Sequence, residues 1–174
     1  MSPLHYDNNK PKYIRYAMFA VLILIVSLLQ NSNVAFPEIF GARAFLLLPL
    51  SVVISMHERE IPAAIFGAFS GALWDVCSAN DGFNTLVLML LSAISSILIS
   101  HFMRRNVITS FVLSAGAVGI YNILYVIVNL LGEGAGNPLR QMISFYLPST
   151  IYTLVFVPVF YFLVDWIFEN YKTE

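Results

Sequence analysis

The chain carries, at residues 61–84, the stretch IPAAIFGAFSGALWDVCSANDGFN, whose apolar and glycine-rich part contains a single aspartate. Residues four apart share one face of a helix. Here that face carries Ala63, Gly67, Gly71 and Asp75. Very small side chains let helices approach closely in lipid, and an ionisable group at membrane depth faces protein or water. The stretch therefore predicts a tightly packed helix at the centre of a membrane protein.

The composition of the whole chain also indicates a membrane protein. Of the 174 residues, 59% are hydrophobic and 11% are charged, and the mean hydropathy is +0.78. These values lie far outside the range of a soluble domain. Because a helix needs about 20 apolar residues to cross ~30 Å of hydrocarbon, six spans are predicted, at residues 13–30, 43–56, 61–79, 84–100, 107–131 and 143–166.

The six runs leave only short connections, so we expect an all-α fold in which residues 1–174 form one transmembrane domain, a single bundle of six helices. The second run is short and contains Pro49. It is therefore predicted to be kinked, tilted, or extended by residues 40–42.

The positions of Lys and Arg predict the orientation of the chain. Two of them, Arg43 and Arg140, lie on one side of the six-span arrangement. Seven lie on the other side, namely Lys10, Lys12, Arg15, Arg59, Arg104, Arg105 and Lys172. Since cytoplasmic loops carry the excess of Lys and Arg, both termini are predicted to be cytoplasmic.

Asp75 is the charged residue that lies well inside a predicted span, about 20 Å from the cytoplasmic edge at ~1.5 Å per residue. Two interpretations of its carboxylate remain open. It forms an ion pair with Arg43 at the outer end of the second span, or it accepts backbone N–H groups from residues 80–84 or the start of the next helix. A structural role in this hairpin is preferred over a contact with a partner or ligand. Proton or ion transfer is least favoured, because it usually enlists several ionisable groups.

Serines recur every four residues in the fourth run, at Ser92, Ser96 and Ser100, which predicts close helix packing. Further polar side chains lie near the outer ends of the last two spans. They are Asn122, Tyr125, Asn129, Tyr146, Ser149 and Thr153. Because such groups are costly in lipid, they either enclose a small polar cavity or hydrogen-bond with one another inside the bundle. Hydrogen bonding is the preferred interpretation.

Motifs of catalysis are not found. Residues 57–60, His-Glu-Arg-Glu, are predicted to be a solvated cytoplasmic turn, because His57 and Glu58 point apart on a helix and no ligand four residues on completes a zinc pair. The single cysteine, Cys77, excludes an intrachain disulfide and a multi-cysteine metal site. No phosphate loop, nucleophile turn or intramembrane protease motif occurs, and no basic patch has interleaved aromatics. We therefore expect no enzyme activity, no cofactor or metal, and no nucleic-acid partner.

Residues 67–76 and 82–86 resemble the signature of MreD, a family of rod shape-determining membrane proteins. That signature has two glycines four apart, an apolar pair, an aspartate, and then a glycine and a leucine that open the next helix. The matching motif positions are Gly67, Gly71, Asp75 and Gly82. The Pro-Asp pair that opens the second helix of many members is absent, since residues 41–43 are Gly-Ala-Arg.

The resemblance implies a non-enzymatic component of the cell-wall elongation machinery in the bacterial cytoplasmic membrane. Family members bind MreC, a single-span protein with an extracytoplasmic coiled coil and β-domain. Through MreC they influence the transpeptidase and glycosyltransferase that make peptidoglycan, in register with MreB filaments. Their fold is similar to that of the substrate-binding subunits of energy-coupling-factor vitamin transporters.

That similarity defines the alternative function, a vitamin-binding subunit of an energy-coupling-factor transporter. Such subunits often carry an Ala-x-x-x-Ala docking motif in the first helix. This chain has Ala17 and Ala20 there, at a different spacing. We therefore prefer the scaffold function.

The smooth face also predicts how substitutions behave. If Gly67 and Gly71 mediate close contact, within the bundle or with the MreC span, leucine at position 71 abolishes it. Alanine is expected to be much milder, because the added methyl group is small.

The predicted orientation can be tested by cysteine labelling after Cys77 has been replaced. Cysteines introduced at Ser2 or Thr173 are expected to resist an impermeant thiol reagent in intact cells, whereas one at Gly134 is expected to react. Labelling at both termini with protection at Gly134 would reverse the orientation.

Overall fold

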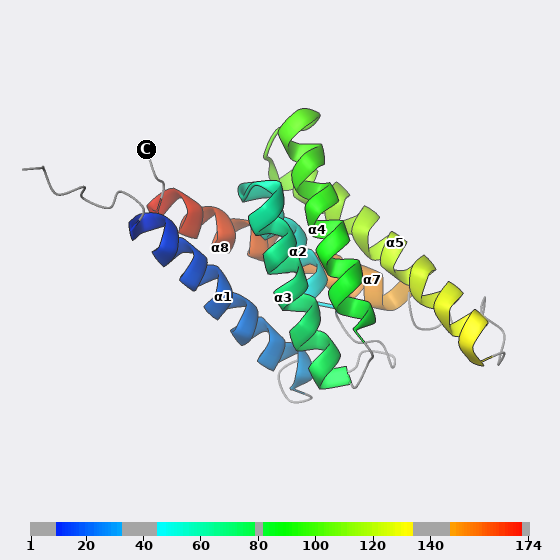
Figure 1. The fold of residues 1–174 in the computed structure, drawn as a ribbon. Helices are drawn as coiled ribbons and strands as arrows, with labels where there is room; N and C mark the ends of the chain where they lie inside the picture. Colours follow the sequence, from blue (N-terminus) through cyan, green and yellow to red (C-terminus); the bar gives the residue numbers. More distant parts are fainter. Residues whose placement is uncertain (1–9, 33–44, 79–81, 134–146, 172–174) are drawn as a thin grey trace, which may run out of the picture.

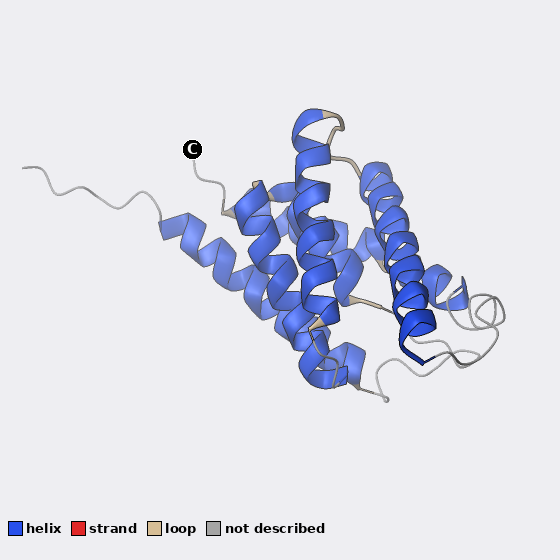
Figure 2. Cartoon of the chain, turned by 45° about the vertical axis from the view of Figure 1, so that its right-hand side comes forward, coloured by secondary structure: helices blue, strands red, loops and turns tan. Residues whose placement is uncertain are grey.

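The computed structural model describes residues 10–32, 45–78, 82–133 and 147–171, and these residues form a bundle of helices (Figure 1). The helices are α1 (Lys10–Asn31), α2 (Leu47–His57), α3 (Glu60–Ser78), α4 (Phe83–His101), α5 (Val107–Glu133), α7 (Leu147–Val155) and α8 (Val157–Asn170). Figure 2 shows that this part of the chain contains helices and loops but no strand. The predicted all-α class is therefore confirmed for the described residues.

Five segments of the described chain are long and apolar enough to cross a membrane. They are Lys10–Asn31, Glu60–Ser78, Phe83–His101, Val107–Val128 and Pro148–Asn170. Their outward faces carry large exposed apolar side chains, including Leu28, Ile65, Leu90, Ile123 and Phe162. So many apolar side chains in contact with solvent would be unfavourable in water. In lipid they need no cover, which is the pattern of a multi-pass membrane protein.

The described part of the last predicted run, residues 143–166, belongs to one membrane-length segment, Pro148–Asn170, but this segment is broken within its length. The described part of this run forms α7 and α8, which are separated at Phe156. Pro158 lies at the start of α8. Proline has no N–H to donate and its ring clashes with the carbonyl four residues earlier. The two helices therefore follow one another with a break, and the second continues to Asn170.

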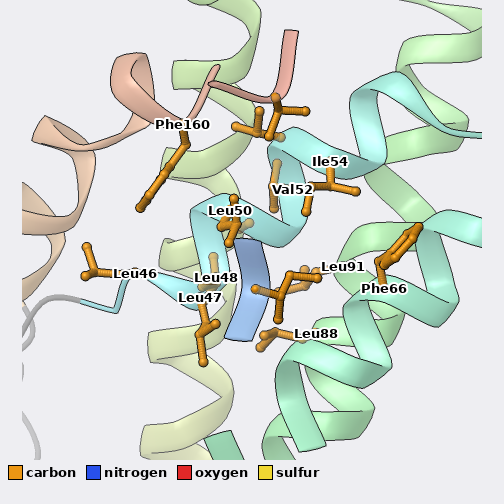
Figure 3. Packing of buried hydrophobic residues seen from close by; sticks show 14 of the residues in the cluster. Leu46, Leu47, Leu48, Leu50, Val52, Ile54, Phe66, Leu88, Leu91 and Phe160 are labelled. Atoms are coloured by element: carbon orange, nitrogen blue, oxygen red, sulfur yellow. The ribbon is translucent and has the colours of Figure 1, made fainter. Parts of the chain in front are cut away.

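Helix α2 lies at the centre of the bundle. Its 11 residues span only about 16 Å, roughly half of the hydrocarbon thickness. All 11 are buried, and α1, α3, α4, α5 and α8 pack around them. Figure 3 shows leucines of α2 lying beside Leu88 and Leu91 of α4 and Phe160 of α8. A helix that is apolar all round is buried, so α2 forms the core, and residues 40–44 before it lie outside the described residues.

Side chains of other helices satisfy the backbone at both ends of α2. The N–H of Leu47 donates to Gln30 Oε1 of α1 at 2.9 Å, and the N–H of Phe45 donates to Thr153 Oγ1 of α7 at 2.9 Å. Beyond the other end, Ser96 Oγ of α4 donates to the carbonyl of Glu58 at 2.7 Å. Helix ends leave backbone groups without intrahelical partners, which is costly where water is excluded. A short buried helix therefore depends on its neighbours at both termini.

Candidate functional site: the α3–α4 hairpin

The smooth face of α3 is covered by α4. Ala63, Gly67, Gly71 and Asp75 are all buried. A Cβ atom added at Gly67 would lie 2.5 Å from the carbonyl oxygen of Leu88 and 2.5 Å from Ser92 Oγ. One added at Gly71 would lie 2.5 Å from the carbonyl oxygen of Asn84 and closer still to Thr85 Cα. The two backbones therefore meet directly, and this face is occupied within the bundle.

The expectation that alanine is much milder than leucine stays a prediction, but the structure leaves no free space for the methyl group of alanine on this face. At Gly71 the added methyl group would overlap the backbone of α4, at Asn84 and Thr85. A backbone in a packed helix cannot turn aside as the end of a flexible side chain can, so the two helices would have to separate. The contact therefore needs the complete absence of a side chain.

Asp75 is a cap supplied by α3 to the first turn of α4. Its Oδ1 accepts the N–H of Asn84 at 3.1 Å, and its Oδ2 accepts the N–H of Thr85 at 2.7 Å and the Thr85 hydroxyl at 2.6 Å. First-turn N–H groups have no intrahelical acceptor, and the positive end of the helix dipole favours a carboxylate there. This is the second of the two arrangements considered for Asp75. Arg43, the other partner considered, lies outside the described residues.

The residue before α4 explains why the cap comes from a different helix. Gly82 occupies the N-cap position with a φ of 84°, in the left-handed region that favours glycine, and it has no side chain to offer. The acceptor that Ser, Thr, Asp or Asn normally provides at this position is provided by Asp75. Gly82 and Asp75 are thus complementary parts of one turn, although they are separated in the sequence.

The hairpin is tied to α5 through Asn84. The Tyr121 hydroxyl donates to Asn84 Oδ1 at 2.7 Å, and both residues are buried. The Tyr121 ring stacks on Trp74 of α3, with centroids 5.3 Å apart and an interplanar angle of 21°. Helices α3, α4 and α5 are therefore joined at the end of the bundle that holds Asp75.

The chemistry available to Asp75 follows from these bonds. Both carboxylate oxygens already accept hydrogen bonds from α4, and Thr85 supplies two of the three donors. Across the described ranges, no group of three or more His, Cys, Asp or Glu residues is placed to hold a metal ion. The geometry is that of a structural carboxylate that fixes the hairpin.

Two of the polar residues predicted near the outer ends of the last two spans make side-chain hydrogen bonds, and one of these bonds joins two helices. Asn122 Nδ2 of α5 donates to Thr150 Oγ1 of α7 at 3.0 Å. Thr153 Oγ1 donates to the carbonyl of Ser149 at 2.7 Å and accepts the N–H of Phe45. Asn122 and Thr153 therefore follow the preferred interpretation, hydrogen bonding inside the bundle, whereas the buried Ser149 hydroxyl has no hydrogen-bond partner among the described residues.

Three other members of that stripe complete the comparison. The Tyr125 ring stacks on Tyr121, with centroids 6.1 Å apart and an interplanar angle of 26°. The Asn129 side chain and Tyr146 lie outside the described part. Tyr125 therefore extends the stack of aromatic rings formed by Trp74 and Tyr121.

The prediction of a solvated turn at residues 57–60 is wrong for its first half. His57 is 3% exposed and Glu58 is 8% exposed. Arg15 of α1 pairs with Glu58, with Nε 2.6 Å from Oε1 and Nη2 3.2 Å from Oε2. Burial raises the pKa of Glu58, and the positive charge of Arg15 opposes that rise. Arg15 is a charged residue in an apolar helix, and such a residue needs a counter-charge. The sequence therefore indicated that Arg15 has a partner, but it did not identify Glu58, because 43 positions separate the two residues.

Comparison with known proteins adds no relative to this description. No family model matches the chain, and neither a curated protein nor a solved structure matches it. The resemblance to MreD therefore depends on residues 67–76 and 82–86, which are the residues that form the α3–α4 contact and its turn.

The close contact of α3 and α4 predicts that Gly71→Ala destabilises the protein by about 1–3 kcal/mol, the usual cost of overpacking. The matched control is Gly116→Ala, because a Cβ atom at Gly116 of α5 would meet nothing within 4 Å. Thermal unfolding of the purified variants in detergent measures the difference. Equal stability of the two variants would contradict the backbone contact.

Capping by Asp75 predicts a graded series of stabilities. Asp75→Leu leaves the first-turn donors unpaired, at roughly 1–3 kcal/mol each. Asp75→Asn keeps one acceptor but places an amide NH2 group against a donor, so its stability is expected to be intermediate. Thr85→Val removes one of the three bonds and is expected to lose about 0.5–1.5 kcal/mol.

The same thermal measurement distinguishes capping from an ion pair. If the Asn variant is as unstable as the Leu variant, the charge of Asp75 matters more than its hydrogen bonds, and Arg43 becomes the first partner to test by a double substitution. If the Leu variant is as stable as the unchanged protein, the capping role is excluded.

Proposed function

We propose that this chain is a non-enzymatic membrane scaffold of the MreD type, which binds MreC and so helps to control peptidoglycan synthesis and rod cell shape. The observation that carries the proposal is the coincidence of motif and contact. The glycines and the aspartate that resemble the MreD signature are the residues through which α3 meets α4.

The state of the motif supports a scaffold more than a carrier. Asp75 accepts three hydrogen bonds from α4, and the glycines have no room for a side chain. Proton and ion carriers need groups whose partners change during transport. Because the residues of the motif are used for packing, they hold α3 and α4 in one fixed arrangement. A membrane partner can then bind to a surface whose shape does not change.

The covered glycine face also bears on where MreC binds. Since α4 already occupies the face of Gly67 and Gly71, the span of MreC packs on another surface in this proposal. The outward faces of the long helices are apolar and exposed. Van der Waals packing between helices in lipid suits such faces.

The proposal is tested by co-purification and by complementation. The tagged chain, expressed with MreC from the same genome and extracted in mild detergent, is expected to retain MreC. The same chain is expected to restore rod shape to cells depleted of their own MreD. Gly71→Leu is expected to lose both properties together with the folded protein, and Gly116→Ala is expected to keep both.

Two results would contradict the scaffold function. A well-folded chain that neither retains MreC nor restores rod shape would exclude it. Co-purification of a bound vitamin and of energy-coupling ATPases in place of MreC would replace it with the vitamin-binding alternative.

A stable Asp75→Leu variant that fails to restore rod shape would show that Asp75 contacts the partner and does not have a structural role.

A further inference from the structure

A pocket of about 370 Å³ is lined by residues from the end of the bundle where α1 begins and α8 ends. Figure 1 shows these two helix ends lying close together. Its walls come from the first turns of α1, the α2–α3 turn, the α4–α5 connection and the last turns of α8. The volume is within the range of small-ligand sites. The charged and aromatic side chains that carry the argument are Lys12, Arg15, Glu58, Arg59, Arg105 and Phe168.

The lining of this pocket has an excess of positive charge. It includes four basic side chains, and Glu58 is the one carboxylate among its lining residues. Glu58 is already paired with Arg15, and both side chains are almost completely buried, at 5% and 7% exposure. The pair is neutral as a unit, so Lys12, Arg59 and Arg105 contribute three positive charges that Glu58 does not balance.

Two guanidinium groups meet at one ring in the wall of the pocket. The centre of the Arg15 guanidinium lies 4.8 Å from the Phe168 centroid, and that of Arg105 lies 5.3 Å from the same centroid. The face of an aromatic ring attracts each cation. Because Glu58 neutralises Arg15, the positive charge of Arg105 beside this ring has no counter-charge among the lining residues, and an anion in the pocket would supply one.

The position of the pocket indicates which anion it meets. It lies at the ends of membrane-length helices, which in a bilayer bring their terminal turns close to the lipid headgroups. Three residues close in sequence to the lining residues, Ile14 of α1, Ile61 of α3 and Trp166 of α8, are exposed apolar side chains. Guanidinium groups match the oxygens of phosphate, and basic pockets between membrane helices accept anionic headgroups.

We propose that this pocket binds a phosphate group, and that its source is the headgroup of an anionic phospholipid whose acyl chains lie along the exposed apolar faces nearby. Arg59 and Arg105 contact the phosphate, while Arg15 is held in place by Glu58. The proposal does not depend on MreC. It holds whether the chain acts as a scaffold or binds a vitamin.

The test uses the purified full chain in a neutral detergent and follows its thermal unfolding midpoint. The probes are short-chain phosphatidylglycerol, short-chain phosphatidylcholine and inorganic phosphate, each over the same concentration range. Phosphatidylglycerol is expected to raise the midpoint in a saturable manner, since a ligand of the folded state stabilises it. Phosphatidylcholine and inorganic phosphate are expected to have little effect.

Variants of the basic residues locate the site. Arg59→Gln and Arg105→Gln are each expected to weaken the apparent affinity for phosphatidylglycerol about tenfold, the loss of one charged contact. The matched control is Arg104→Gln, because Arg104 is exposed, adjoins Arg105 and does not line the pocket. It is expected to keep the affinity of the unchanged protein. Arg59→Gln also keeps the two cation–ring contacts of Phe168, so it remains informative if Arg105→Gln folds poorly.

Each outcome decides the proposal. Stabilisation by inorganic phosphate equal to that by phosphatidylglycerol, with the same loss in the Arg59 and Arg105 variants, supports a phosphate site and excludes the lipid as its source. Equal effects of phosphatidylglycerol and phosphatidylcholine overturn the proposal. So does an equal loss of affinity in the Arg104 control and the two pocket variants.

Discussion

The direct contact between the backbones of α3 and α4 is the interaction on which the rest of the bundle depends. At Gly67 and Gly71 there is no side chain to hold the helices apart. Because the helices approach so closely, Asp75 reaches the first N–H groups of α4 and takes the place of the missing N-cap side chain. That cap places Asn84 where Tyr121 of α5 hydrogen-bonds to it. One close approach thus determines where three helices meet.

A second constraint acts throughout the bundle, since backbone and charged groups removed from water must find partners in the protein. Helix α2 is too short to approach the bilayer surface at both ends, and its terminal groups are satisfied by Gln30 and Thr153 at one end and Ser96 at the other. The same requirement pairs Arg15 with Glu58. Polar residues from distant parts of the sequence therefore have the same role, because each supplies a hydrogen bond or an ion pair that lipid cannot supply.

The two ends of the bundle differ in character, which bears on function. At the end with Asp75, hydrogen bonds and stacked aromatic rings join α3, α4 and α5. The opposite end opens into a basic pocket. In our proposals the end with Asp75 gives the constant shape that a scaffold offers to MreC, and the end with the basic pocket holds the bundle to anionic lipid. Loss of one function need not remove the other, because different residues carry them.

The sequence by itself determined the helical class, the approximate bounds of most helices and the shared helix face of Gly67, Gly71 and Asp75, because apolar run length and four-residue spacing are local properties of the chain. Only the tertiary structure decided what those residues touch. The lack of space for a methyl group at position 71 depends on the backbone of α4. Glu58 is buried in a pair with Arg15 of α1, and buried His57 contacts Tyr161 and Phe168 of α8. Such contacts join residues far apart in the chain, and spacing along one helix carries no information about the surface packed against it.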